Sequence, residues 1–324
     1  MKAVPRRIKA AVVGVGYLGR FHAEKYAAHP HAELVAVVDA DAGRGQAVGA
    51  ELGAEALTDH RALVGRVDCA SIAVPTNRHF EVARDLLEAG IDVLVEKPVT
   101  TTVEEAKGLV ELAVRGGRVL QVGHLERFNP AVVALDGLIT QPRFIECHRL
   151  APFTERGTDV DVVLDLMIHD LDVILSMVQS PLRSVEAVGV PVLTSSVDIA
   201  NARLRFANGC IANVTASRVS LKRERKLRIF QADAYIAVDY GERRIRICRR
   251  EPEANGQAAL VLEDREVPEG DALESEIDAF LRAVRDREPP AVSGWDGLRA
   301  LEVAHVIRES LETEVRAVQA ASAS

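Results

Sequence analysis

The sequence predicts an α/β fold with two domains, a doubly wound parallel sheet followed by an α+β domain with an open, mostly antiparallel sheet. Up to about residue 125, buried-strand runs alternate with helical runs, which is typical of a parallel sheet. Beyond Pro181, apolar and polar residues alternate, and Asn208-Gly209 separates two such runs as in a hairpin. We therefore expect domains at 1–125 and 126–324, with the C-terminal helix able to pack back on the first.

The composition is that of a soluble globular protein. The chain has 324 residues, of which 48% are hydrophobic and 27% charged. Its net charge of −8 argues against nucleic-acid and membrane partners, and the basic run at 217–228, which lacks interleaved aromatics, is interpreted as solvated strands. The four cysteines form no CxxC pair, so we expect a reducing, cytoplasmic location and no metal. The apolar run near the N-terminus is interpreted as a strand, not a signal peptide.

A glycine-rich loop follows the first expected strand. Residues Ile8 to Val13 form a buried-strand run, and a helical run begins after Gly19. A G-x-G-x-x-G loop between a strand and a helix is the dinucleotide-binding pattern of a Rossmann domain, whereas an unrelated glycine-rich turn is the alternative. The first glycine permits the tight turn, the second admits the pyrophosphate and the third allows close helix packing. The residues expected at the cofactor are Gly14, Gly16, Tyr17, Leu18 and Gly19.

The second expected strand determines the choice of cofactor. It runs from Glu33 to Val38 and ends in Asp39, about twenty residues beyond the last glycine. A carboxylate at this point accepts hydrogen bonds from the adenosine ribose and repels a 2′-phosphate. The sequence therefore favours NAD over NADP, although the nearby Arg44 keeps NADP open as the less favoured cofactor.

The later strands of the first domain deliver polar residues to one edge. The runs 67–74, 91–95 and 119–122 are strand-like, and ligands of parallel sheets bind beyond the carboxyl ends of the strands. We expect the following residues along that edge: Pro75, Thr76, Asn77, His79, Glu96, Lys97, Pro98, Gly123, His124 and Glu126.

These motifs together carry a family resemblance. G-x-G-x-x-G, then P-T-N-x-x-H at Pro75 to His79, then E-K-P at Glu96 to Pro98, resembles the glucose–fructose oxidoreductase and inositol dehydrogenase (Gfo/Idh/MocA) family of NAD(P)-dependent sugar oxidoreductases. The resemblance implies that Lys97 lies beside the nicotinamide and the reacting hydroxyl. It also implies that Pro75, Thr76, Asn77, His79 and Glu96 contribute to the cofactor site, and that the Lys97–Pro98 bond is cis.

The segment Asp161 to Val178 is expected to form one helix with a narrow polar stripe. On a helical wheel the stripe spans roughly 80° and the remaining residues are almost all apolar, so the helix should be buried. A buried stripe of carboxylates and an imidazole should line a polar cavity, and a solvated acidic face is the alternative. The stripe contains Asp161, Asp165, His169, Asp172 and Ser176, with Asp161 expected to cap the helix, and Asp170 falls on the far side with no expected role.

The family resemblance assigns chemistry to part of this stripe. Its members carry an aspartate and a histidine four residues apart on a helix that faces the nicotinamide, and Asp165 and His169 match that spacing. We expect His169 to be the base, Asp165 to orient it and Lys97 to donate to the same hydroxyl, with the roles of Lys97 and His169 interchangeable.

Three segments resemble UDP-N-acetylglucosamine 3-dehydrogenases within that family: GHLERFNP from Gly123, PFTERGTDVD from Pro152, and DLMIHDLD. This resemblance implies oxidation of a UDP-N-acetylhexosamine to the 3-keto sugar nucleotide, which an aminotransferase converts to a diamino sugar for lipid A or surface glycans. A dehydrogenase of a free polyol such as inositol and a non-catalytic NAD-binding protein are the alternatives. The expected substrate contacts are Lys97, His124, Glu126, Arg127, Arg149, Arg156, Asp165 and His169.

The open antiparallel sheet of the second domain needs cover on its second face. A homo-dimer or homo-tetramer through this sheet is the simplest solution, and it agrees with the family resemblance.

Overall fold

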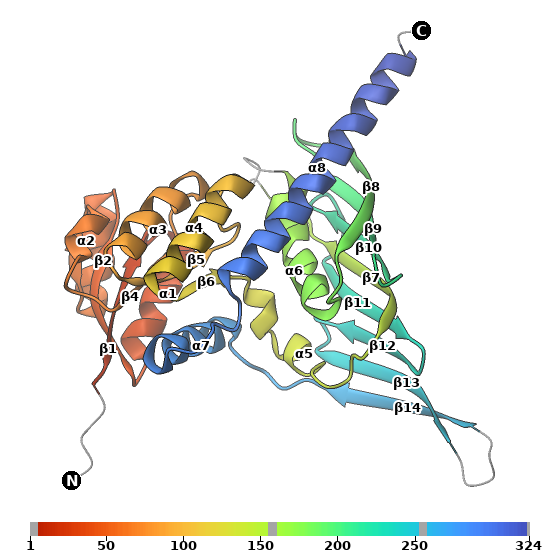
Figure 1. Cartoon of the computed structure of the whole chain (residues 1–324), viewed down its shortest axis with the longest axis horizontal. Coiled ribbons are helices and arrows are strands. Elements are labelled where there is room, and N and C mark those ends of the chain that lie inside the picture. Colours follow the sequence, from red (N-terminus) through yellow and green to blue (C-terminus); the bar gives the residue numbers. More distant parts are fainter. Residues whose placement is uncertain (1–5, 155–160, 253–257, 323–324) are drawn as a thin grey trace. The chain divides into compact units, whose positions relative to one another are not determined.

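The structure, a computed structural model, describes residues 6–154, 161–252 and 258–322, which form two compact units (Figure 1). The first unit contains residues 1–128 together with Asp271–Leu298, and the second contains Asn129–Gly270 and the chain from Arg299. A six-stranded parallel sheet and an eight-stranded, mostly antiparallel sheet confirm the predicted fold class. The segment Asp271–Leu298, expected in the second domain, belongs to the first unit.

The sheet of the first unit is parallel throughout and has the order β3-β2-β1-β4-β5-β6. The chain first winds outward from β1 to β3 and then returns to continue from β4 on the other side of β1. Such a reversal opens a crevice at the carboxyl ends of the two central strands, where ligands of doubly wound sheets bind. The strands are β1 (Ile8–Val13), β2 (Ala32–Val38), β3 (Glu55–Leu57), β4 (Cys69–Ile72), β5 (Asp92–Glu96) and β6 (Leu120–Gly123).

Two helices of the first unit, α2 and α4, begin at residues whose side chains cap the helix. Helix α4 begins with a capping box, in which Thr102 accepts a hydrogen bond from the Glu105 amide and the Glu105 carboxylate accepts one from the Thr102 amide. Helix α2 begins at Asp41, whose carboxylate accepts from the Arg44 amide. The helices are α1 (Tyr17–Ala28), α2 (Ala42–Leu52), α3 (His79–Glu88) and α4 (Val103–Gly116), and short 3₁₀ turns lie at His60–Leu63, Thr76–Arg78 and Leu125–Phe128.

Helix α7 (Ala272–Asp286) explains why the first unit includes a late segment of the chain. Its apolar face carries Ile277 and Phe280, which are fully buried in the same core cluster as Tyr26 of α1 and Val12 of β1. The helical period of the sequence indicates that α7 has an apolar face, but it does not indicate which core that face enters. The domain boundary expected from the change of pattern was therefore wrong for this segment.

The sheet of the second unit has the order β14-β13-β12-β11-β7-β10-β9-β8. Only the pair of β7 and β10 is parallel, and every other neighbouring pair is antiparallel. The predicted hairpin at Asn208-Gly209 is confirmed between β9 and β10, with Gly209 at a φ of +86°. The strands are β7 (Pro142–Leu150), β8 (Leu182–Val190), β9 (Ile199–Phe206), β10 (Ile211–Ser217), β11 (Glu224–Gln231), β12 (Ala234–Asp239), β13 (Arg244–Pro252) and β14 (Ala258–Glu266).

The expected single helix over 161–178 has two parts. A π-helical turn spans Val163–Met167, and the α-helix α6 begins only at Ile168 and ends at Met177. A π turn holds an extra residue per turn, so it rotates the residues after it relative to a regular wheel. The stripe drawn at 100° per residue was therefore wrong in detail.

Helices cover one face of the second sheet (Figure 1). The buried side of α6 and the part of α8 (Gly294–Ser322) beyond Arg299 share one core cluster with β7, β9, β10 and β11. The short helix α5 (Pro130–Val133) adds Ala131 and Val132 to that core. Among the described elements, no helix lies on the opposite face, and none of the described helices combines the length and apolarity needed to cross a membrane.

The packing of α7 predicts that Phe280→Ala destabilises the first unit by about 3–5 kcal/mol, because it removes a fully buried ring and leaves a cavity. Denaturant unfolding measures the effect. Val114→Ala on α4 is the control, since Val114 is 66% exposed and its truncation should change the free energy of unfolding by less than about 0.5 kcal/mol. Equal effects of the two changes would contradict the assignment of α7 to this core.

Candidate active site

The glycine loop is shaped to receive a phosphate group. Gly14 has a φ of +85°, and a Cβ there would lie 2.7 Å from the Ala73 carbonyl oxygen, so only glycine fits the turn. A Cβ on Gly19 would overlap the carbonyl oxygen of Gly14, because α1 begins directly against the loop. A Cβ on Gly16, by contrast, would meet nothing within 4 Å. Neither turn geometry nor protein packing requires glycine at position 16, and this is the pattern expected where a pyrophosphate approaches the backbone.

Asp39 closes the ribose end of this loop. Its carboxylate accepts hydrogen bonds from the amides of Val15 (3.0 Å) and Asp41 (2.9 Å), so the backbone holds it in place. Arg44 Nη1 lies 3.4 Å from both carboxylate oxygens while its side chain is half exposed. In this ion pair the Asp39 carboxylate is buried, and the Arg44 guanidinium faces solvent.

The motif after β4 divides into exposed and buried residues. Pro75 and Asn77 are exposed and Thr76 is half-buried, whereas His79 is buried. Its Nδ1 lies 2.9 Å from the Pro98 carbonyl oxygen and its Nε2 lies 2.9 Å from that of Val74. Burial lowers the pKa of His79, and these backbone contacts oppose that shift only in part. These contacts hold His79 between two loops, and its expected contribution to the cofactor site stays a prediction.

The E-K-P motif lies at the carboxyl end of β5. The Lys97–Pro98 peptide bond is cis, as the family resemblance predicted. Glu96 is buried, Lys97 is half-buried, and the Lys97 amide donates to Glu96 Oε2 at 3.3 Å. A Cβ on Gly123 would lie 3.0 Å from the Glu96 carboxyl, so glycine at the end of β6 makes room for that side chain. Next to it, His124 and Glu126 are buried and Arg127 is half-buried.

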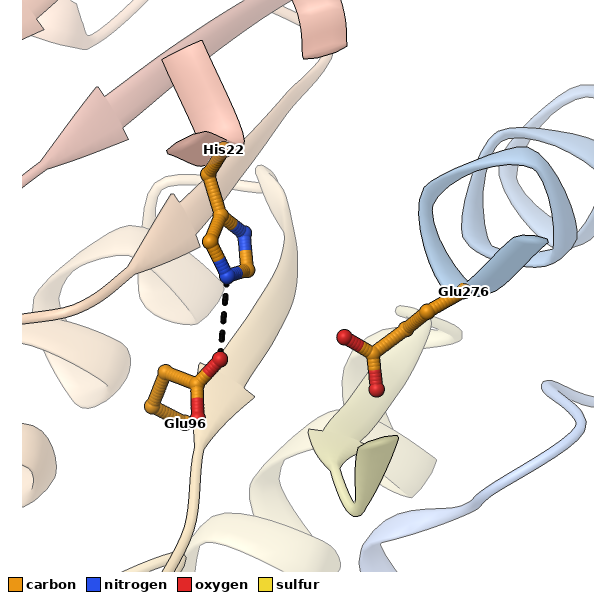
Figure 2. Close-up of side chains that lie close together, drawn as sticks. All are labelled: His22, Glu96 and Glu276. Atoms are coloured by element: carbon orange, nitrogen blue, oxygen red, sulfur yellow. Dashed lines mark hydrogen bonds and ion pairs between the residues drawn. The ribbon is translucent and has the colours of Figure 1, made fainter. Parts of the chain in front are cut away.

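Two residues near Glu96 escaped prediction. His22 of α1 and Glu276 of α7 are fully buried, and with Glu96 they bring ring nitrogen and carboxylate oxygens within 4.8 Å of one another (Figure 2). Each lies on the apolar face of its helix, His22 between Gly19 and Tyr26 and Glu276 beside Ile277 and Phe280. A polar residue at an apolar helical position was the signal that could have found them.

The candidate residues of the second unit lie on and beside the π turn. Asp165 falls within the turn and His169 follows it in α6, and both are half-buried. Asp161 caps the helix as expected, accepting from the amides of Val163 and Leu164, and also pairs with Arg308 of α8 at 2.6 Å. The Ser176 hydroxyl donates to a carbonyl of its own helix, and Asp172 is buried. The stripe therefore contains structural as well as candidate catalytic groups.

Asp170, which had no expected role, forms a buried ion pair. Arg149 Nε donates to one carboxylate oxygen of Asp170 at 2.8 Å and Arg149 Nη2 to the other at 2.7 Å. The two side chains are 5% and 3% exposed. The far side of the helix faces β7, which carries Arg149. Arg149 was expected to bind substrate, and its described contacts are those of a bidentate pair that offsets a buried carboxylate.

One remaining expectation and one cavity concern cationic groups. Arg156 lies outside the described residues. A cavity of about 430 Å³ in the second unit has cationic and acidic residues in equal number on its lining, so its composition does not mark an anion site. These residues are Arg223, Arg225, Lys226, Glu224, Asp239 and Glu242.

Comparison with known proteins agrees with this geometry. The family model described as an oxidoreductase family with an NAD-binding Rossmann fold matches residues 8–124, and the GFO/IDH/MocA C-terminal domain model matches residues 132–237. The first unit is thus an NAD-binding Rossmann fold.

Individual relatives match over nearly the whole chain. The UDP-N-acetylglucosamine 3-dehydrogenase of Acidithiobacillus ferrooxidans is 40% identical over 307 residues, which cover 94% of this chain and 97% of the relative. A solved structure of that protein superposes with a TM-score of 0.90 and covers 95% of this chain and 99% of its own. The scyllo-inositol 2-dehydrogenase (NAD(+)) of Bacillus subtilis is 27% identical and covers 92% of each chain.

The pair of Arg149 and Asp170 predicts a strong effect of Asp170→Asn. The change removes the carboxylate charge that two nitrogens of a buried guanidinium contact, and it should destabilise the protein by about 3–5 kcal/mol in denaturant unfolding. Asp264→Asn is the matched control, because Asp264 pairs with Arg246 on the surface, where both side chains are 60% exposed. An unfolding midpoint of Asp170→Asn equal to that of the control would show that the buried pair does not stabilise the fold.

Proposed function

The chain belongs to the Gfo/Idh/MocA family of NAD-binding oxidoreductases, and we propose that it oxidises the 3-hydroxyl group of UDP-N-acetylglucosamine to the 3-keto sugar nucleotide. The observation that carries the proposal is the 40% identity, over 94% of this chain, with a relative that bears this activity in its name. The segments that resemble such enzymes, around Gly123–Pro130 and Asp165–Asp172, contribute to both units.

The chemistry requires a proton acceptor, a cation for the developing alkoxide and a hydride acceptor. NAD supplies the hydride acceptor when it is bound. In this proposal His169 accepts the hydroxyl proton, and Asp165 orients the ring and favours its protonated form. The Lys97 ammonium donates to the same oxygen and stabilises the negative charge that develops there. Lys97 and His169 can exchange these two roles without any change in the overall proton balance.

The cofactor contacts follow the glycine loop and the rim of the first sheet. We assign the pyrophosphate to the loop from Gly14 to Gly19 and the ribose hydroxyls to Asp39. The buried position of Asp39 supports the preference for NAD, since a 2′-phosphate would meet a carboxylate that the backbone holds in place. Pro75, Thr76 and Asn77 border the nicotinamide end in this assignment.

The substrate contacts are proposed from the same motifs. His124, Glu126 and Arg127 follow β6, and together with Arg156 they supply groups for the sugar and the diphosphate. Arg149 would influence substrate binding mainly by positioning its neighbours, because its guanidinium is buried against Asp170. The product is a ketone next to an acetamido carbon, so an aminotransferase is the reaction class that consumes it in diamino-sugar synthesis. We place the reaction in the cytoplasm, which agrees with the free thiols of Cys69, Cys147, Cys210 and Cys248.

Turnover of the nucleotide sugar is the direct prediction. The protein mixed with NAD and UDP-N-acetylglucosamine should raise the absorbance of reduced cofactor, and an aminotransferase with its amino donor should pull the reaction forward if the equilibrium favours the alcohol. scyllo-Inositol and myo-inositol are the comparison substrates, because inositol dehydrogenases are also relatives. Turnover of an inositol but not of the nucleotide sugar would overturn the proposed substrate, and NAD binding without any turnover would indicate a binding protein.

The catalytic assignment predicts that Lys97→Ala and His169→Ala each lower kcat by about 10²- to 10⁴-fold, while NAD affinity changes little. The matched controls are Lys107→Ala on α4 and His31→Ala before β2, both at exposed positions. Steady-state kinetics and cofactor titration measure the two quantities. A variant of Lys97 or His169 with the kcat of its control would remove that residue from the mechanism.

We further propose that a second copy of this chain covers the open face of the second sheet, as a homo-dimer or within a homo-tetramer. Apolar residues on neighbouring strands pair in register across that face: Phe144, Phe230, Tyr235, Cys248 and Leu262. The ring centroids are 5.6 Å apart for the first two and 4.8 Å apart for Phe230 and Tyr235. Leu262 is 74% exposed, and an apolar stripe of this kind marks an association surface.

This surface predicts that Leu262→Lys dissociates the oligomer in sedimentation analysis, because a charge would be buried in the stripe. Val114→Lys on α4 is the control, at a similarly exposed aliphatic position outside the sheet. A wild-type monomer, or a Leu262→Lys protein with the mass of the wild type, would contradict the interface.

A further inference from the structure

A chain of buried hydrogen bonds leads from the interior of the first unit to the residue before Lys97. The Tyr26 hydroxyl lies 2.8 Å from the Ser71 hydroxyl, which lies 3.2 Å from Nδ1 of His22. Nε2 of His22 lies 2.9 Å from Oε1 of Glu96 (Figure 2). The other oxygen of Glu96 accepts from the Lys97 amide at 3.3 Å. The chain thus connects α1 and β4 to the E-K-P motif.

Glu276 brings a second carboxylate to the same place. It projects from α7 toward the space where His22 and Glu96 meet, and it is fully buried (Figure 2). The relevant atoms of His22, Glu96 and Glu276 all lie within 4.8 Å of one another. A carboxylate from a helix late in the chain therefore joins a pair formed by the Rossmann sheet and its first helix.

Electrostatics requires these three groups to share protons. Two ionised carboxylates this close and shielded from water repel each other strongly, and an imidazolium between them relieves the repulsion. With one shared proton the group carries a net charge of −1, whether the proton is on the imidazole or on a carboxyl. Burial raises the pKa of Glu96, but its hydrogen bond to His22 and the charges of His22 and Lys97 outweigh burial, so the net shift is downward. Glu96 is therefore the member that remains ionised, next to Lys97.

Two neighbouring groups, Tyr26 and Cys69, do not provide a competing proton donor. Burial, followed by the neighbouring Cys69 and Glu276, raises the pKa of Tyr26 well above its ordinary value, and burial likewise raises that of Cys69. Both stay neutral at working pH. His124 follows Gly123, the register partner of Glu96 on β6, and is the remaining titratable group on the adjoining strand.

A histidine with two carboxylates is also a donor set that a divalent metal can use. The separation of 2.9 Å between His22 Nε2 and Glu96 Oε1 is an ordinary N–H···O distance. A hydrogen bond between Ser71 and the other ring nitrogen continues the same chain. We therefore interpret the cluster as a hydrogen-bonded group, and the metal content of the purified protein tests the alternative.

We propose that His22 and Glu276 are positioning residues that keep Glu96 anionic behind Lys97, and so hold the lysine ammonium ready for the substrate hydroxyl. The proposal rests on the role assigned to Lys97 above. Neither residue touches substrate or cofactor in this scheme. Glu276 supplies the net negative charge of the cluster, and His22 carries the shared proton to Glu96.

The test compares Glu276→Gln and His22→Gln in the full-length protein with Glu274→Gln. Glu274 is on the same helix, 65% exposed and paired with Lys25, so it controls for a change of charge on α7. Glu276→Gln should shift the midpoint of the kcat profile to lower pH by about one unit, because the cluster loses one negative charge while His22 and Glu96 keep their shared proton, and a less negative neighbour favours loss of the lysine proton. NAD affinity and KM should change by less than about threefold, and Glu276→Asp should restore the midpoint.

Infrared difference spectroscopy tests the shared proton without any substrate. The carboxyl band that Glu276→Gln removes should also be displaced in His22→Gln and should be unaffected in Glu274→Gln. If the wild type turns over no sugar, the proposed function fails, and the infrared result alone then decides whether the cluster shares a proton.

Three results would overturn the inference. One is a pH profile of Glu276→Gln that superposes on the wild type. Another is a parallel loss of NAD affinity and kcat with an unmoved midpoint, which a merely structural role would produce. The third is a stoichiometric divalent metal in the purified protein whose removal by a chelator abolishes activity.

Discussion

The close approach of helix α1 to the glycine loop is the constraint on which the rest of the site depends. Because Gly19 has no side chain, the helix begins directly against the Gly14 carbonyl. This contact fixes how closely α1 packs against the sheet. His22, one turn further along α1, then lies beside Glu96 at the end of β5. The same contact leaves Gly16 facing open space for a phosphate. Cofactor binding and the environment of Lys97 thus share one packing requirement.

Buried carboxylates are a recurring feature, and backbone amides, a guanidinium or an imidazole stabilise them. Asp39 is held by backbone amides, Asp170 by the guanidinium of Arg149, and Glu96 by an imidazole. Asp198 accepts hydrogen bonds from the amides of a loop and from the Thr194 hydroxyl, which overcome burial and lower its pKa to about 2. Asp170 and Asp198 shape the second unit, whereas Asp39 and Glu96 lie at the ligand edge of the first. Burial of a carboxylate therefore does not by itself identify a functional residue, and its place relative to the ligand edge of the sheet is what distinguishes the two kinds.

Helix α7 relates the fold to the chemistry. A segment that follows the entire second sheet returns to complete the core of the first unit, and in doing so it places Glu276 beside His22 and Glu96. The Rossmann unit of this chain is thus incomplete without a late part of the sequence.

The sequence by itself determined those features that depend on a few neighbouring residues. The first strand, the glycine loop and the helix follow one another directly, and Asp39 ends the next strand. E-K-P and the Asn208-Gly209 hairpin are short local patterns. Each of these features could therefore be predicted from neighbouring residues and the family resemblance. The tertiary structure alone decided the partners of buried groups. Three features depend on contacts between residues far apart in the chain: the core that α7 enters, the burial of Asp170 and the direction of the Glu276 side chain. Helical periodicity specifies the apolar face of a helix but not the elements against which that face packs. The π turn at Val163–Met167 was missed for a related reason, because a regular wheel assumes the hydrogen-bond register that tertiary packing here alters.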